Sequence, residues 1–264
     1  VRLALRLMGV LKVDRKLQDR LFQEIQDSLH EELNYEIEAQ NLEVFRTFHS
    51  SLDSKIIIPK VFPEYSSRRV LTLSLEKGES IETASTWDLN IRNDIGRRLV
   101  RALGQQMFYL KRFHCDPHPG NFAFREDGSV IIYDFGGVKT LSNELVERFK
   151  KLVRAGRLQD ISSIEEHLTE LDALAEKGKF PPELYQLWLE VLLRPLTKHY
   201  DFAENSAHHD GVVLVKKSLK YWDTFKPSPD TLMVNRTISG QYWNLIHLKV
   251  IDNLNDLFEE LVPN

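Results

Sequence analysis

Two short motifs constrain the fold of this 264-residue chain more than any other feature of its sequence. The first runs from His114 to Asn121 and reads His-Cys-Asp-Pro-His-Pro-Gly-Asn, so that four residues separate Asp116 from Asn121. The second is Asp-Phe-Gly at 134–136, and it begins thirteen residues after Asn121. Fixed residue types at fixed spacing rarely coincide by chance in a chain of this length. The two motifs therefore predict two loops that meet at one site.

The side chains of these loops suit the transfer of a phosphoryl group. That reaction needs magnesium held against the phosphates of ATP and an acceptor held in line with them. Asn121 and Asp134 supply an amide oxygen and a carboxylate, and magnesium prefers such oxygen ligands. Asp116 is the candidate catalytic base, and His114 is a candidate that braces the loop rather than reacting. We therefore expect ATP and magnesium as cofactors.

Apolar patterns predict the elements in front of the motifs. Helical spacing predicts helices over residues 14–48 and 88–113, with Arg98 of the second helix facing solvent. Short apolar runs bounded by Pro, Ser and Gly predict strands over 56–62 and 69–75.

Between and after the motifs the pattern changes from strand to helix. Two apolar runs, 122–124 and 130–133, flank Asp127-Gly128, a dipeptide that favours a hairpin turn. Beyond Leu141 the chain is almost wholly helical. Ser142 is the predicted N-cap of the first of these helices, and Pro181-Pro182 is predicted to open another. The last predicted helix carries Leu245, Leu248, Ile251, Leu254 and Leu261. Core positions are predicted for Trp188, Trp222 and Trp243, and a polar loop for His208-His209-Asp210.

This order of elements predicts an α+β chain with a protein-kinase-like, two-lobed architecture. Residues 1–77 would form an incomplete small lobe with a helix and two strands, and residues 78–264 a mostly helical large lobe that holds both motifs.

The first loop also has a narrower resemblance. Protein kinases carry a basic residue between the Asp and the Asn, whereas this loop has Pro-His-Pro-Gly and resembles the catalytic loop of the UbiB/AarF/ADCK atypical kinases. Upstream, Glu31–Asn41 reads Glu-Glu-Leu-Asn-Tyr-Glu-Ile-Glu-Ala-Gln-Asn and is similar to the acidic helix of that family. The resemblance covers residues from about 14 to 141, and continues loosely through Pro229, Arg236 and Gly240.

The resemblance implies roles that the residues alone do not. Glu38 would pair with the nucleotide-binding lysine, and Glu32 would belong to an acidic motif facing the nucleotide. Asn34 departs from the family, which commonly has Asp there, so a metal or lysine contact at this position would be weaker. The implied function is support of ubiquinone or related isoprenoid-lipid metabolism, with an association with lipid or a membrane surface.

The family's lysine-bearing strand and phosphate loop have no counterpart before residue 14, and the chain begins with Val1. We therefore expect a sequence shortened at its N-terminus, which would be a poor enzyme as it stands.

Composition narrows the setting. A net charge of −4 gives no general attraction to nucleic acid, and no apolar run is long enough to span a membrane. The single cysteine, Cys115, forbids an intrachain disulfide, and its expected role is that of a small buried residue. The expected location is the cytoplasm, peripheral at a membrane, or the mitochondrion in a eukaryote. The sequence names no protein partner.

Three alternatives stay open. The spacing of Asp116 and Asn121 also fits small-molecule phosphotransferases of the aminoglycoside or choline kinase type, although the acidic helix and the Phe of Asp-Phe-Gly favour the UbiB-like reading. A pseudokinase would bind nucleotide without turnover. His114 and His118 have the spacing of a helical zinc pair, but Pro117 and Pro119 disfavour a helix there.

Overall fold

The computed structural model of the chain describes residues 34–174, 180–204, 206–224 and 229–263. Its α-helices are α3 (Tyr35–Ser50), α4 (Ile81–Ala84), α5 (Leu89–Gln105), α6 (Asn143–Arg157), α7 (Ile161–Glu170), α8 (Pro182–Leu192), α9 (Arg194–Thr197), α10 (Ser206–Ser218), α11 (Pro229–His247) and α12 (Asn255–Leu261). Its strands are β1 (Ile56–Ile57), β2 (Arg112–His114), β3 (Phe122–Phe124), β4 (Val130–Ile132), β5 (Val138–Thr140), β6 (Tyr200–Asp201) and β7 (Ile251–Asp252). Shorter helical turns are η1 (Pro63–Tyr65), η2 (Gln106–Leu110), η3 (Pro119–Asn121), η4 (Phe202–Glu204) and η5 (Leu219–Thr224).

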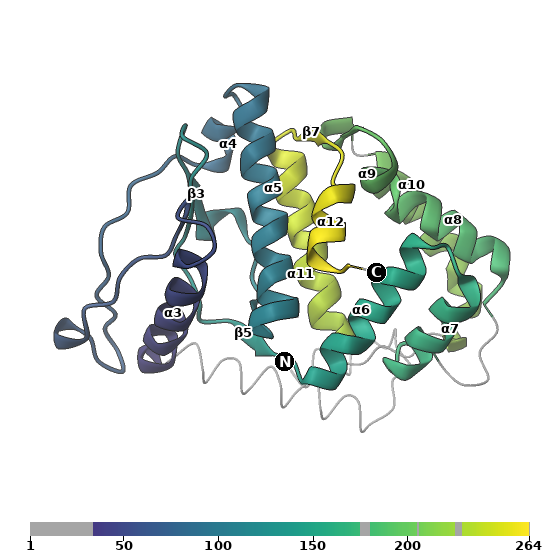
Figure 1. Cartoon of the computed structure of the whole chain (residues 1–264), viewed down its shortest axis with the longest axis horizontal. Helices are drawn as coiled ribbons and strands as arrows, with labels where there is room; N and C mark the ends of the chain where they lie inside the picture. The colour runs from purple at the N-terminus through teal and green to yellow at the C-terminus, as the bar shows by residue number, and fades with distance from the viewer. Residues whose placement is uncertain (1–33, 175–179, 205, 225–228, 264) are drawn as a thin grey trace, which may run out of the picture.

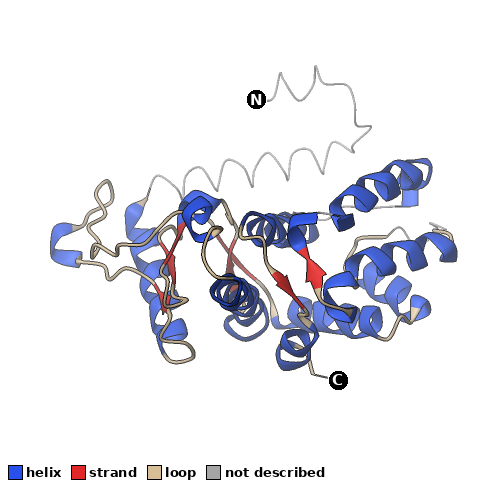
Figure 2. Ribbon diagram, turned by 90° about the horizontal axis from the view of Figure 1, so that it is seen from above, coloured by secondary structure: helices blue, strands red, loops and turns tan. Residues whose placement is uncertain are grey.

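Three small sheets lie among these helices (Figure 2). In the first, β4 lies between β1, which runs parallel to it, and β3, which runs antiparallel. The second pairs β2 with β5 and so joins the segments on either side of the two motifs. The third pairs β6 with β7 near the C-terminus.

Helix α5 runs through the middle of the molecule (Figure 1). Helix α3 and strand β3 lie on one side of it, and α7, α8 and α10 lie towards the other end of the molecule. The largest buried cluster unites Phe45 of α3, Phe124 of β3, Leu99 of α5 and Leu248 near the C-terminus. The predicted apolar stripe of α5 is confirmed, since Leu99 and its continuation at Met107 are buried.

The predicted hairpin is confirmed and explains one glycine. Gly128 lies in the turn between β3 and β4 with a φ of +85°, a conformation that side chains with a Cβ rarely adopt. A Cβ at this position would also lie 2.3 Å from the Asp94 carboxylate of α5. The turn therefore packs directly on α5 and fixes where the hairpin stands.

Arg98 does not face solvent, and that prediction is wrong. Its side chain donates to Asp53 at 2.7 Å, to Asp94 at 2.9 Å and to the Gly128 carbonyl at 2.6 Å. Only 8% of the residue is exposed. The guanidinium joins α5 to the end of α3 and to the hairpin turn, and such long-range partners leave no trace in helical periodicity.

The predicted strand over 69–75 is wrong, and the one over 56–62 is reduced to β1. Between residues 61 and 73 the β-structure is limited to isolated bridges, Val61 with Leu73 and Ser67 with Val70, with turn η1 between them. The hydroxyls of Ser66 and Ser74 accept hydrogen bonds from backbone N–H groups of this segment and so replace part of a strand ladder.

The predicted last helix is wrong in its continuity. Helix α11 ends at His247, Lys249 has a φ of 53°, and the chain then forms β7 before α12 begins. Leu248, Leu254 and Leu261 are nevertheless buried, so the apolar pattern marked core positions but not the break between them.

Two smaller predictions about the C-terminal half are also wrong. His208-His209-Asp210 lies within helix α10 rather than in a loop. Trp243 is 38% exposed and makes an edge-to-face contact with His208, with ring centroids 4.9 Å apart. Trp188 is partly buried against the core, as predicted, and the side chain of Trp222 lies outside what the structure describes. The predicted N-cap of α6 at Ser142 and the opening of α8 after Pro181 are confirmed.

Candidate active site

The loop from Asp116 to Asn121 folds back on itself. Turn η3 brings Asn121 round so that its Nδ2 donates to the Asp116 carbonyl at 3.0 Å and to Asp116 Oδ2 at 3.1 Å. His118 supports the turn, because its Nδ1 accepts from the Gly120 N–H at 3.0 Å. Since the amide nitrogen of Asn121 is committed to Asp116, the amide oxygen is the group left to face a ligand.

Asp134 begins the second loop, two residues after the end of β4. Its Oδ1 accepts from the Gly136 N–H at 2.7 Å, which closes the turn of the Asp-Phe-Gly motif. Glu38 of α3 comes close to it: the pKa of Glu38 is raised by burial and by the negative charge of Asp134, while a hydrogen bond from the Phe135 backbone opposes the rise. Helix α3 thus brings a second carboxylate to Asp134.

Phe135 anchors the second loop in the core. Its ring is fully buried and lies 4.5 Å, centroid to centroid, from Phe45 of α3 and 5.3 Å from His114. Its carbonyl accepts from Asn41 Nδ2 at 2.9 Å, and Asn41 Oδ1 accepts from Arg112 Nη2 at 2.6 Å. The motif is therefore held between α3 and β2, the strand that leads into the first loop.

The His114 side chain is enclosed in the interior and is not one of the exposed polar groups of the two loops. It is buried, and burial lowers the pKa of its imidazole to about 4, although the nearby carboxylates of Asp134 and Asp116 oppose this. Its backbone N–H donates to Gln106 Oε1 at 3.2 Å, and Gln106 Nε2 lies 3.0 Å from His49 Nε2 of α3. A neutral, enclosed ring suits a bracing role better than proton transfer.

Two further residues were singled out in the acidic helix, and the structure describes one of them. Glu32 lies outside the described residues. Asn34 is the N-cap of α3, where its Oδ1 accepts from the Glu36 N–H at 3.3 Å. Asn34 thus has a capping role, which Asn fills as well as Asp does; the weaker metal or lysine contact expected at this position stays a prediction.

The remaining reactive side chains of the loop have structural surroundings. Burial raises the pKa of the Cys115 thiol to about 11, which leaves little thiolate for nucleophilic attack. Cys115 is a small buried residue, as predicted. Among the described residues, no group of three or more His, Cys, Asp and Glu side chains is arranged to hold a metal ion, so the His114–His118 spacing gives no zinc cluster there.

Sequence reasoning missed three contributors. Arg236 of α11 lies 3.5 Å from Asp116 Oδ1, and only the loose family resemblance had drawn attention to it. Asn41 and Gln106 carry the buried hydrogen bonds described above, and a helical periodicity marks such positions only as interior polar residues. A buried Asn or Gln on an otherwise apolar helix face is the signal that would have found them, because its polar groups need partners.

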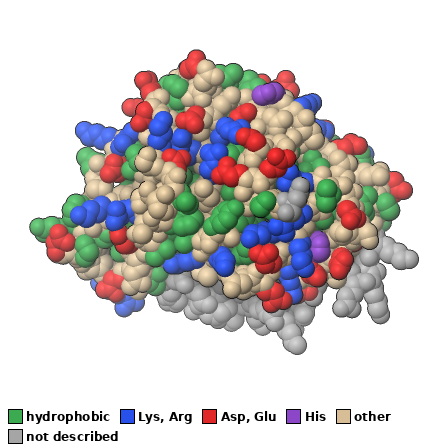
Figure 3. All heavy atoms as spheres, viewed as in Figure 1, with side chains coloured by type: hydrophobic (Ala, Val, Ile, Leu, Met, Phe, Trp, Pro, Cys, Tyr) green, Lys and Arg blue, Asp and Glu red, His purple; other side chains and the backbone are tan. Residues whose placement is uncertain are grey.

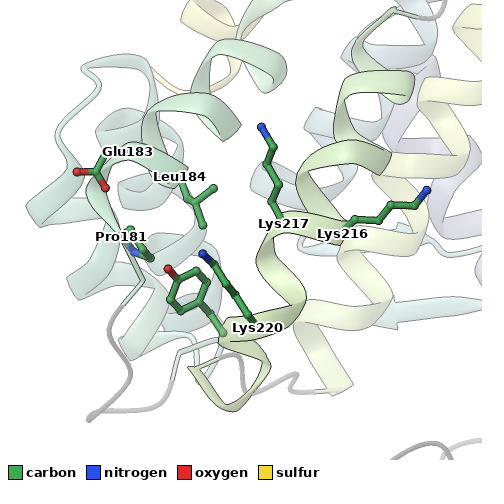
Figure 4. A pocket seen from close by; sticks show the side chains of 7 residues that line it. Pro181, Glu183, Leu184, Lys216, Lys217 and Lys220 are labelled. Atoms are coloured by element: carbon green, nitrogen blue, oxygen red, sulfur yellow. The ribbon is translucent and has the colours of Figure 1, made fainter.

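A cavity elsewhere has different chemistry. It has a volume of about 530 Å³ and is lined by residues of α8, α10 and η5, with Lys216, Lys217 and Lys220 around Leu184 and Tyr221 (Figure 4). These elements lie at the end of the molecule away from α3 and β3 (Figure 1). The cavity therefore belongs to the helical end and not to the two motifs.

The molecular surface carries both signs of charge. On the face shown in Figure 3, acidic and basic side chains are interspersed with apolar ones rather than gathered by sign. Several arginines pair with acids of the C-terminal segment: Arg97 with Asp252 and Asp256, Arg101 with Glu260, and Arg157 with Glu259. This face presents no continuous basic surface of the kind that attracts nucleic acid.

The fold is that of a protein-kinase-like domain. The solved structure of Rv3197 from Mycobacterium tuberculosis in complex with erythromycin matches it with a TM-score of 0.76 at 19% sequence identity, covering 92% of this chain and 61% of that one. At this identity the likeness shows the fold alone. Together with the mixed helices and small sheets, it confirms the predicted α+β, kinase-like class.

A family model for the ABC1 atypical kinase-like domain matches residues 2–168, and the chain therefore belongs to that family. It is 30% identical over 161 residues to the chloroplastic protein Activity of BC1 Complex Kinase 7 of Arabidopsis thaliana. The aligned segment covers 60% of this chain and 23% of that protein. It is 28% identical over 164 residues to the mitochondrial atypical kinase COQ8B of Danio rerio. The aligned segment covers 60% of this chain and 26% of that protein. The chain thus spans about a quarter of the length of these relatives.

Proposed function

We propose that this chain forms part of an atypical kinase or ATPase that binds ATP with magnesium and transfers or hydrolyses its terminal phosphoryl group. The observation that carries the proposal is the hydrogen bonding of Asn121, whose amide nitrogen is tied to Asp116 and whose oxygen is thereby left for a cation. Membership of a kinase-like family supports nucleotide use in general.

The residues fit a magnesium ion. Asn121 offers a neutral oxygen and Asp134 a carboxylate, which are hard ligands of the kind this ion takes while keeping waters and phosphate oxygens around it. Magnesium would neutralise charge on the phosphates. Asp134 is held by the Gly136 N–H, so its second carboxylate oxygen is the one available to the ion.

The other site residues act through position. Asp116 would accept a hydrogen bond from the attacking hydroxyl or water and orient it, as a catalytic base does in kinase-like sites. His114 would hold the loop from behind. Glu38 would orient a nucleotide-binding lysine, because a cation beside Glu38 and Asp134 would offset the burial and the repulsion from Asp134 that together raise the pKa of Glu38.

The boundary between a small lobe, 1–77, and a large lobe, 78–264, is part of this proposal. At Gly78 the chain passes so close to the hairpin that a Cβ would lie 2.8 Å from Ile131 Cδ1 and 2.9 Å from Ala123 Cβ. Beside it, Arg125 forms an ion pair with Glu76 at 3.0 Å. These contacts support a closely packed junction between the two proposed lobes at Gly78.

The proposed setting is lipid metabolism at a membrane surface, including the ubiquinone or isoprenoid chemistry that the family resemblance implies. The two relatives are named as chloroplastic and mitochondrial. In the described part of the chain, no helix has both the length and the apolar character needed to cross a bilayer. Co-sedimentation of the full-length protein with lipid vesicles tests a peripheral association.

The metal assignment is tested by thermal unfolding of the full-length protein with ATP, in the presence of magnesium or of a chelator. A ligand at 100 times its Kd stabilises the folded state by about 2.7 kcal/mol, and we expect that gain only with magnesium. Asp134→Asn should abolish it. Asp127→Asn is the matched control, because Asp127 lies in the hairpin turn, where its carboxylate accepts from the Ser129 N–H.

Three outcomes distinguish the proposed function from its alternatives. Unchanged magnesium-dependent stabilisation in Asp134→Asn would contradict the metal assignment. Binding without release of phosphate would identify a nucleotide-binding scaffold of the pseudokinase type. Rapid phosphorylation of a small hydroxylated compound would favour the small-molecule phosphotransferase alternative.

A further inference from the structure

Helix α11 packs against the catalytic loop, although it lies beyond the segment matched by the family model. One face of the helix carries Arg236, Gly240 and Asn244, which are four residues apart and therefore neighbours. Arg236 lies beside Asp116, and Asn244 Nδ2 donates to the Pro117 carbonyl at 3.0 Å. Helix α11 thus contacts the loop at two successive residues, Asp116 and Pro117.

Gly240 makes this close approach possible. A Cβ at position 240 would lie 2.2 Å from Pro117 Cγ and 3.2 Å from Pro117 Cβ. The pyrrolidine ring is stiff, so it cannot swing aside as a flexible side chain would. Glycine within a helix costs about 1 kcal/mol relative to alanine, and here the contact with Pro117 gives a packing reason for that cost.

Pro117 has little room to withdraw from a larger residue. The cavity between the loop, α5 and α11 is lined by His114, Pro117, Phe122 and Thr237 among others and has a volume of only about 20 Å³. A single water molecule needs about 10–15 Å³ by the same measure, so the cavity has room for about one water and not for a displaced pyrrolidine ring. A displaced ring would therefore move the loop backbone.

We propose that Gly240 is a positioning residue that sets the catalytic loop by seating Pro117 against α11. Pro117 directly follows Asp116, and Asp116 holds the amide of Asn121. A shift of the Pro117 ring is therefore passed to the base and to the metal ligand together. The inference rests on the proposed function of this loop, and it adds a residue that touches neither nucleotide nor metal.

The test substitutes Gly240→Ala in the full-length protein, with Gly211→Ala as the matched control. Gly211 is also within a helix, α10, but a Cβ there would meet nothing within 4 Å. A displacement near 1 Å at a catalytic group can lower turnover about 100-fold. We expect a loss of about that size in kcat for Gly240→Ala, expressed per folded molecule, with the KM for magnesium-ATP changed by less than about threefold, and wild-type values for Gly211→Ala.

A second readout does not depend on activity. Cys115 is the only cysteine in the chain, is buried, and lies two residues before Pro117. In native buffer, the labelling of Cys115 by a thiol reagent, followed on its own peptide by mass spectrometry, should be faster in Gly240→Ala than in wild type or Gly211→Ala. The thiol measurement reports loop displacement even if the protein turns over no nucleotide, so failure of the proposed function can be told from failure of this inference.

The contact itself is tested by a double-mutant cycle with Pro117→Ala, which removes the Cγ that Gly240→Ala would strike. We expect the double variant to be more active, and its thiol slower to react, than the two single changes predict if they act independently. Independent effects would overturn the inference. Wild-type kcat and thiol protection in Gly240→Ala would overturn it as well.

Discussion

Asp116 is held on both sides of its carboxylate. Asn121 Nδ2 donates to Oδ2 at 3.1 Å, and Arg236 lies 3.5 Å from Oδ1. The side chain is nevertheless 46% exposed, so it can meet a substrate. A residue with these contacts is oriented by the protein while remaining open to an acceptor hydroxyl or a water.

We therefore expect Asp116→Asn to lower turnover without loss of nucleotide affinity. The amide keeps the size of the carboxylate and an acceptor oxygen for Asn121, but it cannot take a proton. General base catalysis contributes about 100- to 10,000-fold, and a fall in kcat within that range is expected. The measurement is phosphate release together with the Kd of magnesium-ATP, with Asp88→Asn at the start of α5 as control.

Asp88 caps α5 by accepting from the Asn90 N–H at 2.8 Å, and Asn is an equally good cap. The control substitution therefore changes the same atoms far from the loop and should be silent. Loss of nucleotide binding in Asp116→Asn, with binding intact in Asp88→Asn, would show that Asp116 is a ligand and not a base.

The contact between Asp116 and Asn121 could be predicted from the sequence because it is local. Asp116 and Asn121 are five residues apart, and turn η3 alone brings them together. The hydrogen bonds of Arg98 and Asn41 could not be predicted in the same way. Their partners are Asp53 and Phe135, which are 45 and 94 residues away, and nothing in helical periodicity encodes such pairs.

At the scale of elements, α3 is the helix that holds the Asp-Phe-Gly motif. Its N-terminal cap is Asn34, its middle contributes Glu38 and Asn41, and Phe45 packs on Phe135 one turn later. The resemblance had singled out this helix for its acidic residues. The structure adds that the helix also anchors the motif through a buried amide and an aromatic ring.

We expect Asn41→Leu to destabilise the fold. The substitution leaves the Phe135 carbonyl and the Arg112 guanidinium without their partner in a buried place. A buried polar group left unpaired costs about 1–3 kcal/mol, and more when the group is charged. We predict a loss of about 2–3 kcal/mol in the free energy of unfolding, measured by urea titration.

Gln40→Leu is the matched control, because Gln40 is the neighbouring residue of α3 and is exposed. Substitutions of this kind usually change stability by less than about 0.5 kcal/mol. Equal stabilities of the two variants would mean that the Asn41 bridge does not hold the motif.

The elements that the sequence predicted well are those whose signals lie within them. The hairpin around Gly128 and the cap at Ser142 are examples, since turn and cap chemistry act over a few residues. The strand predicted over 69–75 does not form, and the break at Lys249 was not predicted. In both, local backbone geometry or side-chain hydrogen bonds override an apolar pattern that would suit a longer element.

At the scale of the molecule, a buried polar chain links the end of α3 to the catalytic loop. His49, Gln106 and His114 lie on α3, η2 and β2, and both imidazoles are buried. Burial lowers the pKa of His49 to about 4, against the charge of Asp53, and it lowers the pKa of His114 to about 4. The unfolded chain would protonate both near pH 6.5.

Because the folded-state pKa values are depressed, the folded protein binds fewer protons than the unfolded chain between about pH 4 and 6.5, and its stability falls as the pH is lowered through that window. Each histidine should cost about 2 kcal/mol between pH 7.5 and pH 5. Glu38, whose pKa is raised, contributes in the opposite direction. The informative quantity is therefore the difference between wild type and His49→Gln, in which the glutamine keeps an acceptor for Gln106. Urea titrations at both pH values should show a loss on acidification that is smaller by about 2 kcal/mol in the variant, and an equal loss would mean that His49 is not held neutral in the fold.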